Sequence, residues 1–178
     1  MTEAKDKTEP QLRPAVFLDR DGVMNLDKGY VHRIADFEWV EGARELIQHF
    51  KEMGFLVIVV TNQSGIARGF YRVDAMEELH HWINQELGSI NAQIDGFYYC
   101  PHHPEGSMEE YRKDCDCRKP EPGMILQALQ EWPIDKRDSF LIGDSERDIV
   151  AANSAGIQGY LFEGGNLYEW AKQINLIG

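Results

Sequence analysis

The chain has 178 residues, of which 43% are hydrophobic, so it is long enough for one well-buried domain and short for two. Thirty acidic residues against eighteen basic ones give a net charge of −12, and such a surface repels nucleic-acid phosphates, which disfavours a nucleic-acid partner. No apolar run approaches the roughly 20 residues needed to cross a bilayer, so we expect no membrane partner.

The ends of the chain and its cysteines indicate how it is organised. Residues 1–10 are charged and polar, unlike a secretory signal, and we expect a disordered leader over residues 1–13. One domain is expected over residues 14–178. Three cysteines lie within residues 100–117, and this odd number argues against a disulfide framework and favours a reducing cytoplasm. We expect the protein to be a monomer.

Apolar strands and amphipathic helices alternate along the chain. The expected strands are 16–19, 55–60, 97–99, 139–142 and 160–162, and the expected helices are 41–53, 74–87, 123–131, 149–155 and 168–174. This order predicts an α/β fold with a mainly parallel, doubly wound (Rossmann-like) sheet and helices on both faces. The spacing leaves no room for a separate cap domain, so we expect a capless, open site. Residues 100–123 have no clear period and are too long for an ordinary connection, which indicates a functional loop.

Polar side chains follow three of the expected strands. Asp19 and Asp21 come after the first strand, the run 61–65 after the second, and Asp144 after the fourth. The ends of parallel strands lie on one edge of the sheet, where ligands bind. An aspartate accepts a phosphoryl group readily, and a second one two residues on can donate a proton. We therefore expect phosphoryl transfer, with Asp19 as the nucleophile and Asp21 as the general acid and base.

Other side chains at this edge suit the same reaction. Asp19, Asp144 and a backbone carbonyl near Asp21 are oxygen donors of the kind that Mg²⁺ prefers. The hydroxyl of Thr61 and the ammonium of Lys119 can stabilise the phosphoryl oxygens. Each cluster taken alone also fits a turn or a helix cap, but the combination is hard to assign to turns.

A second constellation indicates a structural metal. The chain brings together three thiols and an imidazole in Cys100, His102, Cys115 and Cys117. These residues form a closed tetrahedral Zn²⁺ set without an open position, so we expect a structural zinc within a loop over about residues 100–119. His103 remains an alternative to His102, and a Cys115–Cys117 disulfide or free thiols are the alternatives to zinc. Because Cys117 directly precedes Arg118 and Lys119, zinc is expected to fix where those cations point.

The aspartate pair, Thr61, Lys119 and the pair Asp144/Asp148 resemble the four motifs of the haloacid dehalogenase superfamily of phosphatases, over roughly residues 15–162. The resemblance implies Asp19 as nucleophile, Asp21 as acid and base, and Mg²⁺ as cofactor.

The zinc loop is similar to that of two groups in this superfamily. One removes the 7-phosphate of D-glycero-D-manno-heptose 1,7-bisphosphate in lipopolysaccharide biosynthesis, and the other hydrolyses histidinol phosphate. Segments 25–32 and 61–69 are more similar to the first group. This similarity does not distinguish the α from the β anomer of the heptose. The residues that this resemblance assigns to substrate binding are Asp27, Lys28, Gly29, Tyr30, Thr61, Asn62, Gln63, Ser64, Arg118 and Lys119. Ser145 departs from the pattern, because a basic residue is expected after Asp144, and one phosphate contact is therefore unaccounted for.

Two alternatives to a sugar bisphosphate phosphatase remain. Histidinol phosphate would want a carboxylate-lined wall, which Asp27 or Glu121 could supply. A non-catalytic phosphoacceptor module, such as a response-regulator receiver, uses a similar set of acid, hydroxyl and lysine. Asp21 argues against the receiver, because a long-lived aspartyl phosphate is not served by a neighbouring general base.

Overall fold

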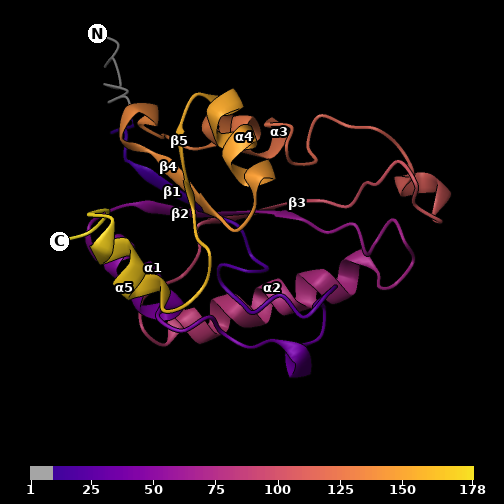
Figure 1. The fold of residues 1–178 in the computed structure, drawn as a ribbon, viewed down its shortest axis with the longest axis horizontal. Coiled ribbons are helices and arrows are strands. Elements are labelled where there is room, and N and C mark those ends of the chain that lie inside the picture. Colours follow the sequence, from indigo (N-terminus) through magenta and orange to yellow (C-terminus); the bar gives the residue numbers. More distant parts are fainter. Residues whose placement is uncertain (1–9) are drawn as a thin grey trace, which may run out of the picture.

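A computed structural model describes residues 10–178 of the chain. Five parallel strands form one sheet in the order β3-β2-β1-β4-β5 (Figure 1). The strands are β1 (Ala15–Leu18), β2 (Leu56–Asn62), β3 (Gly96–Cys100), β4 (Phe140–Gly143) and β5 (Gln158–Leu161). The chain order reverses at β1, between β2 and β4, so the doubly wound parallel sheet predicted from the sequence is confirmed.

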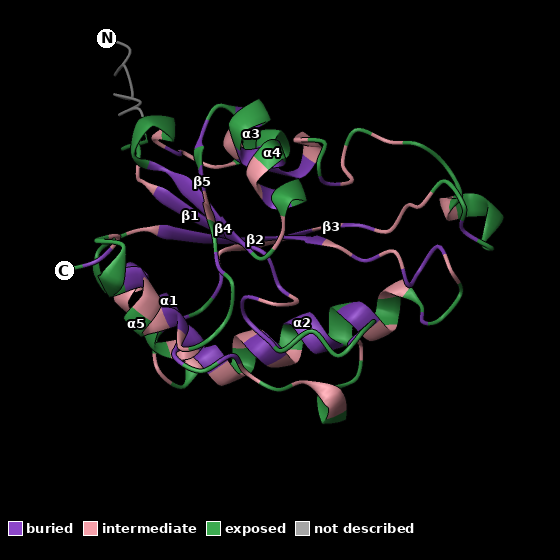
Figure 2. Ribbon diagram, in the orientation of Figure 1, coloured by how far each residue is buried: buried purple, intermediate pink, exposed green. Residues whose placement is uncertain are grey.

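Helices cover both faces of the sheet. They are α1 (Ala43–Glu52), α2 (Val73–Gly88), α3 (Gly123–Glu131), α4 (Glu146–Ala155) and α5 (Leu167–Gln173). Helices α1, α2 and α5 lie below the sheet as drawn in Figure 1, and α3 and α4 lie above it. Alternate residues of β1 supply the two cores: Val16 and Leu18 pack on the first side, and Ala15 and Phe17 on the second. The three central strands β1, β2 and β4 are therefore buried on both faces (Figure 2), which explains their largely apolar sequence.

The connections contain only short turns of helix. These are the 3₁₀ helices η1 (Ile34–Asp36), η2 (Glu109–Tyr111) and η3 (Lys136–Asp138). Within residues 10–178 the connections hold no further domain that would cap the sheet edge. None of the helices described has the length and apolar character that a membrane crossing requires.

Two elements reach further toward the functional edge than their periodicity indicated. Strand β2 continues to Asn62, because Thr61 and Asn62 still pair with Tyr99 and Cys100 of β3. Helix α4 begins at Glu146 and not at Ile149, because Ser145 and Asp148 form a reciprocal capping box. Both extensions concern polar residues that carry no hydrophobic signal, and both bring those residues into regular structure next to the site.

The structure describes only residues 10–13 of the leader expected over residues 1–13. Residues 1–9 of the expected leader lie outside the described residues. Arg13, also assigned to the leader, instead donates its backbone N–H to Pro133 and its side chain to the carbonyls of Gly54 and Phe55. These contacts fasten the entry to β1 against neighbouring loops.

Candidate active site

The carboxyl ends of β1, β2 and β4 and the segment before α3 surround an open cavity of about 410 Å³. The cavity is lined by Asp19, Asp21, Asp27, Gly29, Tyr30, Asn62, Gln63, Ser64, Arg68, Tyr71, Arg118, Lys119, Asp144, Ser145, Arg147 and Asp148. Most of the residues assigned from the sequence are in this set. Among those assigned to catalysis, magnesium or substrate, Lys28 and Thr61 are not, and the four expected zinc ligands also lie outside it.

A buried lysine lies between two aspartates at the floor of the cavity. The Nζ atom of Lys119 is 3.0 Å from Oδ1 of Asp19 and 2.6 Å from Oδ1 of Asp148, and it donates to the carbonyl of Val60 at 2.9 Å. Burial lowers the pKa of Lys119, but the two carboxylates outweigh burial and the net shift is upward. Lys119 is therefore a permanent cation beside Asp19.

The backbone of Lys119 is held by an amide on β2. Asn62 accepts from the Lys119 N–H and donates to the Lys119 carbonyl, both at 3.0 Å. This pair of bonds connects residues far apart in sequence and sets where the lysine enters the site. Asn62, which the resemblance assigns to the substrate, also lines the cavity, and these two bonds leave one amide N–H and one lone pair of its oxygen free.

Three carboxylates gather beside this lysine. Oxygens of Asp19, Asp144 and Asp148 lie within 4.8 Å of one another. Burial raises the pKa of Asp19 to about 7, where the attraction of Lys119 is opposed by repulsion from Asp148 and Asp21. Burial followed by the charge of Asp148 likewise raises the pKa of Asp144. An all-oxygen donor set with this crowding fits a hard divalent cation such as Mg²⁺.

The backbone of Gly22 fits closely under this group. Its φ is +88°, and an added Cβ would lie 2.0 Å from Oδ2 of Asp144. Only glycine therefore lets the turn after β1 pass beneath the Asp144 carboxylate.

The carboxylate of Asp21 lies outside this group and is held by three side chains. Its oxygens accept from Arg20 Nη2 at 3.0 and 3.1 Å, from Asn25 Nδ2 at 3.0 Å and from Gln63 Nε2 at 3.0 Å. Gln63 in turn donates to the hydroxyl of Thr61 and accepts from the hydroxyl of Tyr71. The side chain of Asp21 is thus held by hydrogen bonds beside the three carboxylates and is not one of them.

A fully buried cation supports Asp21 from below. The guanidinium of Arg20 contacts Asp21, the carbonyl of Val31 and Nε2 of His80. Burial, followed by the charge of Arg20, lowers the pKa of His80 to about 3. His80 is therefore neutral in the folded protein at any ordinary pH.

The neutral His80 predicts a specific loss of stability in acid. The unfolded chain protonates this residue near pH 6.5, whereas the folded protein resists protonation down to about pH 3. The unfolding free energy should therefore fall by up to about 1.4 kcal/mol per pH unit as the pH drops through this window. Urea unfolding of wild type and His80→Gln at pH 7 and pH 5 measures this contribution, and equal losses for the two proteins would contradict it.

Several residues of the site carried no signal in the sequence. Arg20, Arg68, Tyr71 and Arg147 had no role in the expected site, and Asp148 was named only as part of a motif. Arg20 stands between two aspartates, a sequence that predicts a solvent-exposed arginine, and nothing in its spacing indicates full burial. Ser145 and Asp148 are the exception, because Ser-x-x-Asp before an apolar helix is a capping signature that the sequence does contain.

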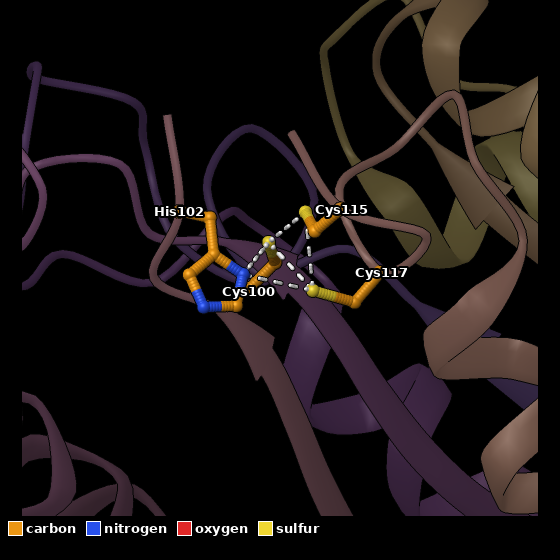
Figure 3. Close-up of side chains that lie close together, drawn as sticks. All are labelled: Cys100, His102, Cys115 and Cys117. Carbon is orange, nitrogen blue, oxygen red and sulfur yellow. Dashed lines mark hydrogen bonds between the residues drawn. The ribbon is translucent and has the colours of Figure 1, made fainter. Parts of the chain in front are cut away.

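The predicted zinc ligands lie together at the end of β3 (Figure 3). The sulfur of Cys100 is 3.5 Å from that of Cys115 and 2.9 Å from that of Cys117, and Nδ1 of His102 is 3.4 Å from the Cys117 sulfur. All three cysteines are free thiols. The four ligand atoms lie within 4.8 Å of one another, and two or more thiolates with an imidazole are the donors that Zn²⁺ prefers.

His103 lies apart from this cluster. Its Nδ1 accepts from the N–H of Glu105 and its Nε2 is 3.2 Å from Arg68. Of the two adjacent histidines, the structure therefore brings His102 to the thiols. The loop also reaches the active site directly, because Nη1 of Arg118 donates to the carbonyl of His102 at 3.4 Å.

This fold and this site together define a phosphatase of the haloacid dehalogenase class. A family model described as HAD-hydrolase-like matches residues 116–172. Among solved structures, a HAD-like phosphatase from Mesorhizobium loti is similar, with a TM-score of 0.81 and 34% identity over 88% of this chain and 75% of that one. D,D-heptose 1,7-bisphosphate phosphatase from B. bronchiseptica, solved with magnesium and phosphate, has a TM-score of 0.77 and 30% identity over 90% of this chain and 86% of that one.

Curated relatives make the family specific. The D-glycero-β-D-manno-heptose-1,7-bisphosphate 7-phosphatase of Pasteurella multocida is 49% identical over 83% of this chain and 79% of its own. The enzyme of that name from Rhodopseudomonas palustris is 45% identical over 91% of this chain and 90% of its own. The chain belongs to the haloacid dehalogenase superfamily, in the family of these heptose bisphosphate phosphatases.

Proposed function

We propose that the protein removes the 7-phosphate of D-glycero-β-D-manno-heptose 1,7-bisphosphate through a phosphorylated Asp19. The relatives carry this activity in their names, and the β anomer is taken from those names. A role in lipopolysaccharide biosynthesis in the cytoplasm is part of the proposal. The observation that carries it is a cavity lined both by the carboxylates and lysine that suit the reacting phosphate and by arginines that suit a second anion.

Three arginines of the cavity suit a second anion. Arg68, Arg118 and Arg147 all line the cavity, and none forms an ion pair with an acidic residue among residues 10–178. Burial, followed by the charges of Arg147 and Arg68, lowers the pKa of Arg118. In a chain of net charge −12, unpaired guanidinium groups so close together favour an anionic ligand. A bisphosphate provides a second anion, and histidinol phosphate does not.

The arrangement of Asp19 and Lys119 in the cavity supports attack by Asp19 on the phosphate. An oxygen of Asp19 bonds to phosphorus as the bond from phosphorus to the sugar oxygen breaks, and Asp21 gives its proton to that oxygen. Asp21 then takes a proton from water, whose oxygen attacks phosphorus and releases inorganic phosphate and free Asp19. Lys119 stabilises negative charge on the phosphoryl oxygens throughout. The relatives are named as phosphatases, which disfavours a receiver that stores the phosphoryl group.

Mg²⁺ fits the carboxylate group described above. Asp19 and Asp144 would hold it with the backbone carbonyl of Asp21, and when bound it supplies positive charge that lets the anionic Asp19 approach a phosphate dianion. Asp148 has a different role, because one of its oxygens pairs with Lys119 and the other accepts from the N–H and hydroxyl of Ser145.

Side-by-side assays test the substrate. With Mg²⁺ present, the β anomer of the heptose bisphosphate should give a higher kcat/KM than the α anomer, heptose 7-phosphate or histidinol phosphate. Faster hydrolysis of histidinol phosphate would overturn the substrate but leave the chemistry in place.

Arg147 should contribute to recognition of the second phosphate. Ser145 lines the cavity but has no positive charge, and Arg147, two residues on, lines it as well and supplies one. Arg147→Ala should raise KM for the bisphosphate roughly 10-fold to 100-fold, the effect of losing one charged hydrogen bond. KM for heptose 7-phosphate, which lacks the second phosphate, should change little. Arg112→Ala, which removes an exposed arginine outside the cavity, is the matched control. Equal KM changes for both substrates would contradict this assignment.

Loss of zinc should act on Arg118 more than on Lys119. Arg118 depends on the carbonyl of His102, whereas Asn62 holds the Lys119 backbone independently of the metal cluster. Chelation that empties the site should therefore lower kcat/KM for the bisphosphate about tenfold, mainly through KM. Zinc content by elemental analysis and circular dichroism establish that the sample is zinc-free and folded. Full activity in such a sample would contradict the prediction.

A further inference from the structure

We propose that Arg20 is a positioning residue, which holds the carboxylate of Asp21 and the substrate-facing segment 27–30 in one fixed arrangement, with neutral His80 as its anchor. The inference rests on the proposed function, because it takes Asp21 as the general acid and base. Arg20 does not line the cavity, so it acts through its neighbours and not on the substrate.

The contacts of Arg20 join three separate parts of the chain. Its side chain is fully buried, and Nη2 donates to both carboxylate oxygens of Asp21 and to the carbonyl of Val31. A rigid guanidinium that reaches Asp21 and Val31 from the same nitrogen fixes the distance between them. Asp21 is the proton donor, and Val31 follows the segment that faces the substrate.

The segment before Val31 is the wall of the cavity. Asp27, Gly29 and Tyr30 line it, and Tyr30 has a φ of +54°, a conformation that L residues seldom adopt without support. The ring of Tyr30 packs edge-on against Phe70 at 4.8 Å, at the rim of the site. The bond from Arg20 to the adjacent carbonyl of Val31 provides the support from inside the protein.

His80 completes the arrangement from helix α2. Its Nε2 lies 3.2 Å from Nη1 of Arg20, and its ring stacks on Phe97 at 4.6 Å with 17° between the planes. A guanidinium can only donate, so Nε2 must accept, and the imidazole must be neutral with its proton on Nδ1. The low pKa of His80 agrees with this. His80 thus keeps Nη1 occupied, and Nη2 is left for Asp21 and Val31.

The reaction provides a readout that a purely structural role would not affect. A sugar alkoxide is a poor leaving group and needs the proton from Asp21, whereas p-nitrophenolate leaves with little help. If Arg20 positions Asp21, its loss should lower kcat/KM far more for the sugar phosphate than for p-nitrophenyl phosphate. A general loss of packing would lower both alike.

The test compares five variants with both substrates and follows folding by circular dichroism. Arg20→Lys keeps the charge but cannot reach three acceptors, so kcat/KM for the heptose bisphosphate should fall roughly 100-fold or more. The decrease in kcat/KM for p-nitrophenyl phosphate should be about tenfold smaller. In His80→Met, which removes the acceptor, kcat/KM for the heptose bisphosphate should fall about tenfold, again more than for p-nitrophenyl phosphate. His80→Gln, which keeps an acceptor, should recover most of this activity. His81→Gln alters the exposed neighbour, whose ring is hydrogen-bonded to Gln85, and should behave as wild type.

The outcomes separate this inference from the proposed function. Asp21→Asn should show the strongest leaving-group bias, and its absence there would overturn the role of Asp21 and with it the inference. Bias in Asp21→Asn, but equal losses for the two substrates in folded Arg20→Lys, would overturn the inference alone. If Arg20→Lys does not fold, the comparison of His80→Met with His81→Gln decides. Identical activity of these two variants would overturn the inference.

Discussion

Replacing Asp19 by asparagine should lower kcat by at least about four orders of magnitude, the scale seen when a covalent nucleophile is removed. The amide has the shape of the carboxylate but cannot form the phosphoryl ester. The stability should not fall with the activity. Burial raises the pKa of Asp19 to about 7, so the ionised carboxylate is costly to the fold above that pH, and a neutral amide removes this cost. Initial rates and urea unfolding at pH 8 measure the two effects.

Asp138→Asn is the matched control, because Asp138 is an exposed aspartate outside the cavity. It should leave both rate and stability unchanged. An Asp19→Asn protein that retains more than about 1% of wild-type kcat would contradict a covalent role, since residual rates after loss of a nucleophile are far lower.

Replacing Lys119 by methionine should damage both activity and stability. The lysine is 3% exposed and pairs with two carboxylates, so its loss leaves buried negative charges without a partner. We expect the unfolding free energy to fall by about 3–5 kcal/mol. We also expect kcat to fall roughly 100-fold to 1,000-fold, because the transition state loses a cation aimed at the phosphoryl oxygens.

A double variant separates these two losses. Asp148→Asn removes one of the unpaired charges, and its amide oxygen can still accept from Ser145 at the start of α4. The Lys119→Met, Asp148→Asn protein should therefore recover much of the stability but none of the activity. Recovery of activity along with stability would show that the lysine serves only to stabilise the fold.

Much of this site could be predicted because ligands bind at the carboxyl ends of parallel strands. Asp19, Asp144 and the run after β2 each follow an apolar strand, and a parallel sheet must bring those ends to one edge. The fold class follows from the alternation of strand and helix. The zinc ligands are close in sequence, so their meeting at the end of β3 needs little of the fold.

The supporting residues could not be predicted, because their roles depend on contacts between distant segments. The amide of Asn62 hydrogen-bonds to the backbone of Lys119, 57 positions away, and Arg20 contacts His80, 60 positions away. An isolated polar residue shows no periodicity, so its burial and its partner are set only by how the elements pack. Lys28 illustrates the same point: it was assigned to the substrate but pairs with Glu38 at 2.7 Å outside the main cavity.

The covalent role of Asp19 can be tested most directly by trapping the phosphorylated protein. An acyl phosphate on aspartate is reduced by borohydride to homoserine, which changes the mass of that residue alone. Asp21→Asn protein, in which hydrolysis of the ester is slowed, should be quenched in acid during turnover with Mg²⁺ and p-nitrophenyl phosphate, whose leaving group needs little help from residue 21, and then reduced and digested. We predict homoserine at position 19 in the peptide that contains β1. Homoserine at another aspartate, or an unmodified residue 19 under turnover, would contradict the account.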